Sequence, residues 1–216
     1  MPKLVYFGMQ GRAQAIRYAM AAQGAEYEGV DVGFEEWGKL KADGTYGVGN
    51  SLPVWVTDDG KMLNQSIAIL RMVCSMGGFV AKTPEEEYDC QWFFDADADW
   101  MKADGSMKPI FNADADEAAV DKCVEIMAGH LGKMDEKMAD GRKYSAGDNV
   151  TAFDFRLLTI STGICNNETL KVPALGEKLR ALWAKHENIV RVEGNLKELP
   201  NMADAVKAAA DRKGFI

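Results

Sequence analysis

The chain has 216 residues, enough for one large domain or two small ones. Hydrophobic residues make up 47% and charged residues 27%, a balance typical of a globular protein that folds in water. The net charge of −8 argues against a nucleic-acid partner and against an anionic membrane surface, because both attract positive charge.

The first third of the chain alternates between strand-like and helix-like segments. Strand formers fill short apolar runs, apolar residues at helical spacing mark the helices, and Asp58-Asp59-Gly60 is a hairpin signal. The order β-α-β, loop, β-β-α predicts a small mixed sheet with helices packed on it. The expected segments are a strand at 4–7, a helix at 10–23, a strand at 27–32, a polar loop at 33–50, strands at 54–56 and 61–63, and a helix from about residue 67 to 77.

The rest of the chain carries no convincing strand. Thr83, Pro84 and Glu86 form a helix start, with a cap, a proline in the first turn and a capping box. The composition changes near 77–85, so we expect an α/β domain at 1–80 followed by an all-helical domain at 81–216. The expected helices run from 83 to about 102, 120–138, 151–160, 175–186 and 202–210.

The cysteines and histidines give no metal or redox motif. Four widely spaced cysteines include no C-x-x-C pair, which predicts buried free thiols rather than a zinc or dithiol site. The two histidines lack metal-ligand spacing, so we expect no metal. The N-terminus does not resemble a signal peptide and no apolar run approaches the roughly 18 residues of a membrane span, so we expect a cytoplasmic protein without a membrane partner.

The β-α-β, β-β-α order is that of the thioredoxin fold. Redox enzymes of that fold carry a cysteine pair just after the first strand, where this chain has Phe7-Gly8-Met9-Gln10. The domain therefore cannot perform dithiol exchange with its own sulfur, and any thiol must arrive as a ligand.

Four motifs, in order along the chain, resemble those of the cytosolic glutathione transferases of the tyrosine type. The resemblance is closest to the sigma class and more distant to the pi and mu classes. The motifs are Tyr6-Phe7-Gly8-Met9-Gln10-Gly11-Arg12-Ala13, Ser51-Leu52-Pro53-Val54, Asn64-Gln65-Ser66-Ile67-Ala68-Ile69-Leu70-Arg71 and Gly147-Asp148-Asn149-Val150-Thr151-Ala152-Phe153-Asp154.

The resemblance implies a thioredoxin-like domain that binds glutathione and a helical bundle that contributes the site of an apolar electrophile. It implies a detoxifying homodimer that uses glutathione as co-substrate, without a prosthetic group, and joins its thiolate to the electrophile. A glutathione-dependent isomerase or peroxidase, a non-enzymatic ligand carrier or crystallin-like relative, and an interaction module remain open alternatives.

Tyr6 is the candidate catalytic residue. A thiol with a pKa near 8.5 is mostly protonated at neutral pH, and a phenol hydroxyl that donates to the sulfur lowers that pKa. In the resembled family this tyrosine has that role, whereas an isolated strand tyrosine is usually a packing residue. Arg12 is implied to support the thiolate and contact the second substrate, with a surface salt bridge as the alternative. The family often has a second arginine where this chain has Gln10.

The resemblance also assigns residues that hold glutathione. Gln65 and Ser66, the latter at a helix cap, would grip the γ-glutamyl carboxylate, because a helix N-terminus offers free N–H groups to an anion. The resemblance implies that Leu52-Pro53 is a cis dipeptide whose backbone pairs with the cysteinyl part of the ligand. Trp37 and Lys41, in the loop after the second strand, match residues that bind the glycine carboxylate.

Asp95, Asp97 and Asp99 alternate along the helix that begins at residue 83. They do not form an EF-hand, whose glycine and glutamate positions are Trp100 and Ser106. Asp99, and second to it Asp97, matches a family aspartate that reaches the glutathione of the other subunit; a solvated helix face is the alternative. Met101, Met107 and Trp100 are candidates for an adaptable apolar site.

Overall fold

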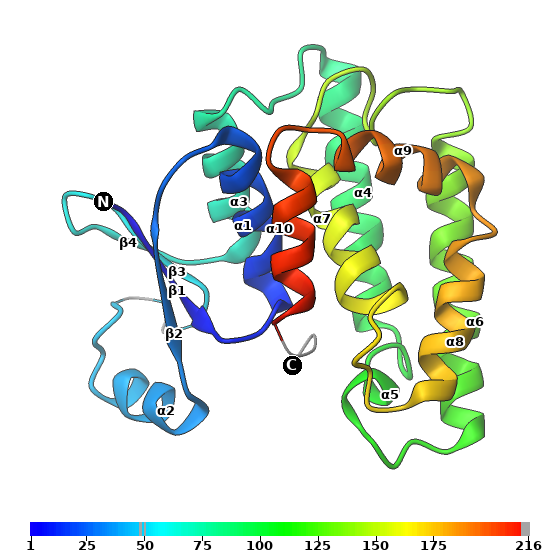
Figure 1. The fold of residues 1–216 in the computed structure, drawn as a ribbon, viewed down its shortest axis with the longest axis horizontal. Helices are drawn as coiled ribbons and strands as arrows, with labels where there is room; N and C mark the ends of the chain where they lie inside the picture. The colour runs from blue at the N-terminus through cyan, green and yellow to red at the C-terminus, as the bar shows by residue number, and fades with distance from the viewer. Residues whose placement is uncertain (48, 50, 213–216) are drawn as a thin grey trace.

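The computed structural model describes residues 1–47, 49 and 51–212, and these form a thioredoxin-like α/β domain followed by an all-helical domain (Figure 1). The fold class expected from the sequence is therefore confirmed. No helix in the described part of the chain is long and apolar enough to cross a membrane.

A mixed sheet of four strands forms the centre of the N-terminal part. β1 pairs in parallel with β2 and antiparallel with β3, and β4 pairs antiparallel with β3, so the spatial order is β2-β1-β3-β4. The parallel pair needs a crossover connection, which contains the helix α1 (Gln14–Gln23). The strands are β1 (Lys3–Phe7), β2 (Glu28–Val32), β3 (Val54–Val56) and β4 (Met62–Leu63).

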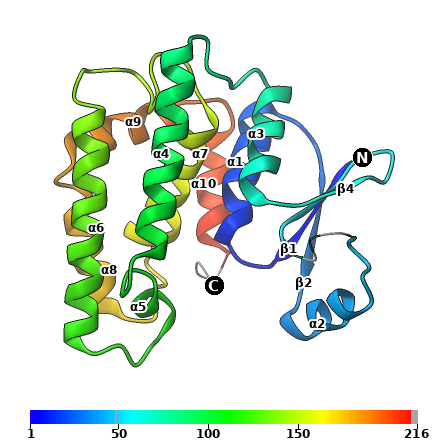
Figure 2. The ribbon, with the colours of Figure 1, turned by 180° about the vertical axis from the view of Figure 1, so that it is seen from behind.

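The two faces of the sheet have separate apolar cores. On one face, Leu4 and Trp55 join a large core that includes α1 (Gln14–Gln23) and α3 (Ser66–Met76), which lie between the sheet and the helical domain in Figures 1 and 2. On the other face, Val5, Val32 and Val54 pack against side chains of a further helix, α2 (Phe34–Ala42). Because successive side chains of β1 point to opposite faces of the sheet, β1 contributes side chains to both cores.

The expectation of a loop throughout 33–50 was wrong, because α2 (Phe34–Ala42) forms there. Gly33 is the N-cap, and its N–H donates to the Glu36 carboxylate over 3.3 Å. An ion pair between Lys39 and Glu35, one helical turn apart, adds a small stabilisation. The helix has no fully buried residue, which explains why its apolar pattern in the sequence is weak.

The C-terminal part is a bundle around α7, every residue of which is buried. The predicted helix start at Thr83 is confirmed, since its side chain accepts from the Glu86 N–H, although Glu86 accepts in turn from Lys82. The short helix α5, the π-helical segment η2 and the helix α9 were not predicted. The helices are α4 (Pro84–Lys102), α5 (Lys108–Phe111), α6 (Glu117–Lys137), α7 (Ala152–Ile160), η2 (Ser161–Cys165), α8 (Pro173–Trp183), α9 (Glu187–Lys197) and α10 (Met202–Ala210).

The predicted capping box of α7 is present and buried. The Asp154 carboxylate accepts from the Thr151 N–H over 2.7 Å and from the Ser145 N–H over 2.8 Å. Burial raises the pKa of Asp154, and these hydrogen bonds act in the opposite direction. The box therefore anchors both the helix start and the loop before it.

A polar cluster joins the two parts of the molecule. Gln10 donates to the carbonyl of Ala209 in α10 over 3.0 Å and accepts from the Thr162 hydroxyl over 3.2 Å. Tyr18 of α1 also bonds the Thr162 hydroxyl. In both ribbon views α10 lies between α1 and the helical bundle (Figures 1 and 2). Gln10 thus forms a contact between the two parts of the molecule.

Candidate active site

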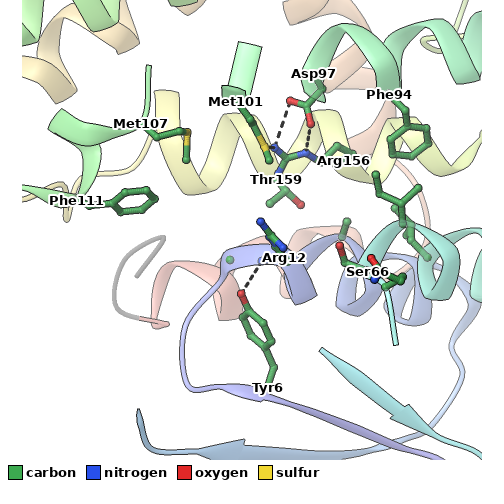
Figure 3. Close-up of a pocket in the computed structure, with 15 residues that line it drawn as sticks. Tyr6, Arg12, Ser66, Phe94, Asp97, Met101, Met107, Phe111, Arg156 and Thr159 are labelled. Carbon is green, nitrogen blue, oxygen red and sulfur yellow. Dashed lines mark hydrogen bonds and ion pairs between the residues drawn. The ribbon is translucent and has the colours of Figure 1, made fainter. Parts of the chain in front are cut away.

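A cavity of about 510 Å³ lies where the two parts of the molecule meet (Figure 3). The N-terminal part supplies the end of β1, the 3-10 turn η1 (Gly11–Ala13), the start of α1 and the first turns of α3. The helical part supplies α4, α5, α7 and the segment between α4 and α5. The lining residues are Tyr6, Gly11, Arg12, Ala15, Gln65, Ser66, Ile67, Leu70, Phe94, Asp97, Met101, Met107, Phe111, Arg156 and Thr159.

Tyr6 stands at the end of β1 with its hydroxyl facing the start of the first helix. The side chain is buried, and its oxygen accepts a hydrogen bond of 3.1 Å from the Arg12 backbone N–H. Because that oxygen is already an acceptor, the hydroxyl proton remains available for a partner in the cavity.

Gly11 makes this placement sterically feasible. A Cβ on Gly11 would lie 2.5 Å from the Tyr6 hydroxyl oxygen, and its φ of +41° lies in the region that favours glycine. The turn between β1 and α1 therefore has both a backbone and a space requirement for glycine at this position.

Arg17 lies beneath the Tyr6 ring, and sequence reasoning gave it no role. Its guanidinium is 5.8 Å from the ring centroid and donates to the carbonyls of Met9 and Gln10 over 2.9 and 3.2 Å. Burial, with the charge of Arg212 second, lowers the pKa of Arg17 to about 10, so the group stays positive at neutral pH. Through these two hydrogen bonds Arg17 holds the turn after β1 in place, and its charge makes the electrostatic potential beside Tyr6 more positive. The available signal was an arginine on an apolar helix.

Gln65 and Ser66 reach the cavity at the start of α3. The cap lies one residue earlier than expected, because Gln65 is the N-cap and Ser66 the first helical residue. Gln65 has a φ of 73°, which is uncommon for a residue other than glycine and is often found at ligand sites. The first turn of this 11-residue helix is open to an anion at the cavity wall.

Leu52 and Pro53 lie just before β3, and their peptide bond is cis, as expected. Neither residue lines the cavity.

Trp37 and Lys41 lie on α2, not in a loop, and α2 packs on the opposite face of the sheet. Trp37 faces Tyr46 at a ring distance of 6.3 Å. The structure therefore does not bring α2 to the cavity.

The three aspartates of α4 point in two directions. Asp97 is buried and lines the cavity, where its carboxylate pairs with Arg156. Asp95 and Asp99 line a second hollow of about 460 Å³ between α4 and α6. Trp100, expected as a candidate for an apolar site, lies in that second hollow, whereas Met101 and Met107 line the main cavity.

The charged part of the cavity wall was not foreseen from the sequence. The Arg156 Nε donates to Asp97 over 2.8 Å, and one Nη donates to the other carboxylate oxygen over 3.2 Å (Figure 3). His130 lies behind the pair, with its Nε2 3.9 Å from Asp97, and its ring stacks on Trp100. Burial lowers the pKa of His130 to about 4, so the imidazole is neutral at neutral pH.

The four cysteines are free and buried, as predicted. Burial raises the pKa of Cys123 to about 11 and that of Cys74 and Cys165 further, so these thiols are poor nucleophiles. Among the described residues, no group of three or more His, Cys, Asp or Glu side chains could hold a metal ion.

Comparisons with known proteins agree on one family. Residues 2–74 match the family model described as "Glutathione S-transferase, N-terminal domain". Glutathione S-transferase 1 of Ascaris suum is 28% identical over 93% of this chain and 92% of its own length. Hematopoietic prostaglandin D synthase of Gallus gallus is 30% identical over 87% of this chain and 89% of its own length.

Solved structures share the fold over nearly the whole chain. The glutathione S-transferase of Ascaris lumbricoides superposes with a TM-score of 0.77 at 25% identity, over 98% of this chain and 97% of that one. Na-GST-3 of Necator americanus, described as monomeric, has a TM-score of 0.77 at 24% identity over 96% of both chains. At this identity the comparison shows only that the two chains share a fold.

Proposed function

Since the chain belongs to the glutathione S-transferase family, we propose that it joins the glutathione thiolate to apolar electrophiles in the cavity between its two parts. The enzyme class expected from the sequence is confirmed by the relatives of that name. The observation that carries the proposal is that Tyr6, the start of α3 and an apolar wall of the helical part line one cavity. The assignment to the sigma class belongs to this proposal and rests on the motif that begins at Tyr6.

Tyr6 is proposed to stabilise the thiolate. Its oxygen accepts from the Arg12 N–H, so the hydroxyl proton is directed to the sulfur of bound glutathione. A hydrogen bond to the charged form favours the thiolate over the thiol. In the reaction, the sulfur forms a bond to the electrophilic carbon, the leaving group departs with its electron pair, and the thiol proton passes to solvent.

The glutathione peptide is proposed to lie along the N-terminal part. Gln65 and Ser66 would hold the γ-glutamyl carboxylate at the start of α3, and the backbone of Leu52-Pro53 would pair with the cysteinyl unit. Trp37 and Lys41 are kept as the proposed partners of the glycine carboxylate. Trp37 and Lys41 both lie on α2, so they can bind the glycine carboxylate only if α2 approaches the ligand from the edge of the sheet.

The electrophile is proposed to lie against the helical part. Phe94, Met101, Met107 and Phe111 supply an apolar wall in which the methionines adapt to different shapes. Arg12 is exposed at the cavity and is proposed to contact the second substrate. Holding both reactants in one cavity adds the benefit of proximity.

The division into domains at 1–80 and 81–216, the homodimer and the cytoplasmic, detoxifying role are also proposals. In the dimer, Asp99 would reach the glutathione of the other subunit. Its position on the α4–α6 side, away from the cavity of its own chain, is consistent with contact to a second molecule. Light scattering on the purified chain tests the dimer, and the monomeric Na-GST-3 is the alternative state.

The decisive experiment uses immobilised glutathione and a chlorodinitrobenzene. Retention of the wild type, with turnover that falls strongly in Tyr6→Phe, supports the proposal. Tyr88→Phe, which changes an exposed tyrosine of α4, is the matched control. Retention without turnover of the wild type would point to a carrier or structural role.

A second candidate activity is isomerisation with glutathione as cofactor. It is favoured by the 30% identity to the Gallus gallus hematopoietic prostaglandin D synthase over 87% of this chain. An assay of prostaglandin D formation, with and without glutathione, tests this alternative. Product formed without consumption of glutathione would distinguish it from conjugation.

A further inference from the structure

The helical wall of the cavity contains an ion pair that a purely apolar second substrate would not use. Arg156 of α7 and Asp97 of α4 face each other with side-chain exposures of 11% and 6%. Both residues line the cavity that Tyr6 and Ser66 line. A buried ion pair gives little net stability compared with apolar side chains of similar size, so stability alone does not account for it.

The pair uses only part of the Arg156 guanidinium. Nε and Nη2 donate to the two Asp97 oxygens, and Nη2 also contacts the Met101 sulfur at 3.2 Å. Within the described part of the chain, Nη1 has no hydrogen-bond partner. In Figure 3 the guanidinium lies on the cavity side of the Asp97 carboxylate. A donor therefore remains for a molecule in the cavity.

The charges around the cavity are not balanced. Asp97 offsets the charge of Arg156, and the neutral His130 behind the pair adds none. Arg12 lines the same cavity and has no ion-pair partner among the described residues. The side chains that line the cavity thus carry one excess positive charge beside an apolar wall.

Building on the proposed function, we propose that Arg156, with Arg12, makes the second-substrate site selective for electrophiles that carry a carboxylate on an apolar body. The carboxylate accepts charge-assisted hydrogen bonds from the guanidinium, while the apolar body lies against Phe94 and the methionines. Asp97 holds the Arg156 guanidinium in position, and its negative charge reduces the electrostatic attraction between Arg156 and a bound anion. Arg156 is a specificity-determining residue, and it takes no part in bond making.

The test compares two probes that differ at one ring substituent, a chlorodinitrobenzoate with a negative carboxylate and the corresponding benzamide with a neutral amide of similar size. In both, the glutathione sulfur bonds to the ring carbon that carried chlorine, chloride leaves with the bonding electrons, and the thiol proton passes to solvent. The ratio of kcat/KM for the acid to that for the amide is the readout. Since charge-assisted hydrogen bonds are the stronger kind, we expect the wild-type ratio, relative to the uncatalysed ratio, to be about tenfold in favour of the acid.

Two variants move the ratio in opposite directions. Arg156→Gln combined with Asp97→Asn keeps a neutral hydrogen-bonding pair and is expected to abolish the preference. Asp97→Asn alone leaves the Arg156 charge without its counter-charge and is expected to raise the preference about threefold or more. A structural effect of either variant would change the rates of both probes together and leave the ratio unchanged. Lys178→Gln with Asp121→Asn, an exposed pair between α6 and α8, is the matched control.

Binding of the two purified glutathione conjugates, measured by calorimetry, gives a readout that needs no turnover. A preference for the carboxylate conjugate that is lost in the double variant supports the inference even if the enzyme proves inactive, in which case only the proposed function fails. Equal binding of both conjugates in the wild type, or a preference that survives the double variant, would overturn the inference.

Discussion

The phenolic oxygen of Tyr6 accepts a hydrogen bond of 3.1 Å from the backbone N–H of Arg12. The two residues lie six positions apart in the chain, and the turn through Gly11 brings them together. The contact orients the hydroxyl, because an oxygen that accepts from one side directs its own proton elsewhere. The remaining direction leads into the cavity that Ser66 and Arg156 also line.

Replacing Tyr6 by Phe should raise the pKa of the bound glutathione thiol. The hydroxyl is proposed to stabilise the thiolate, so its loss should move the pH dependence of kcat/KM upward by about 1 to 2 units and lower the rate at neutral pH about 10- to 100-fold. The profile of the wild type and the variant over pH 5 to about 9 measures the shift. An unchanged profile would show that Tyr6 does not act on the sulfur.

Gly11→Ala should impair activity without unfolding the chain. The new methyl group would lie 2.5 Å from the Tyr6 oxygen on a backbone with φ of +41°. We expect a loss of kcat/KM comparable to that of Tyr6→Phe. Gly194→Ala is the control, since its added Cβ meets no atom within 4 Å and it lies inside α9. That control should be stabilised by about 0.5–1 kcal/mol in thermal unfolding and keep full activity.

The Arg12→Gln variant distinguishes the contribution of the Arg12 backbone N–H from that of its guanidinium. The N–H that contacts Tyr6 belongs to the backbone and survives the replacement. The pH profile with a neutral electrophile should therefore shift less than in Tyr6→Phe. The rate ratio of the acid to the amide probe should fall severalfold, because the cavity loses its excess positive charge. A shift of the pH profile as large as that in Tyr6→Phe would instead show that the Arg12 guanidinium stabilises the thiolate.

Asp154→Ala should be among the most destabilising single changes in the helical part. The carboxylate accepts from Ser145 and from both the N–H and the hydroxyl of Thr151, all in a buried site. We expect a loss of about 2–4 kcal/mol in urea unfolding, since buried donors are left without partners. Asp116→Ala removes the exposed cap of α6 and should cost about 1 kcal/mol. Equal costs for the two variants would contradict the prediction.

His130 should make the fold less stable in mild acid. Burial lowers its pKa from 6.5 to about 4, so the unfolded chain binds a proton between these values that the folded chain does not. By linkage, the contribution is fully present above pH 6.5 and is lost as the pH falls toward 4, to a total of about 3 kcal/mol.

Urea unfolding at several pH values measures this dependence. His130→Gln should remove its share of the acid-side slope, whereas His186→Gln, which changes the only other histidine of the chain, should retain it. The same slope in all three proteins would show that folding does not lower the pKa of His130.

Local signals explain which elements could be predicted. The hairpin around Asp58-Asp59-Gly60, the start of α4 at Thr83 and the helix α10 at 202–210 are fixed by turn chemistry, capping and periodicity. The helix α2 escaped prediction because most of its residues are exposed, and its packing against the second face of the sheet is a tertiary contact.

Local patterns in the sequence were enough to predict all four strands, most of the long helices and the residue types proposed for a thiol-binding site, because strands, caps and the Tyr6 motif depend on neighbours a few residues apart. Which distant residues contact each other was set by the packing of the folded chain. It turned Gln10 toward α10, placed Trp37 and Lys41 on a helix away from the cavity, and paired Asp97 with Arg156 across 59 residues. Such contacts depend on how two helices pack, and nothing in the local spacing of either residue encodes it.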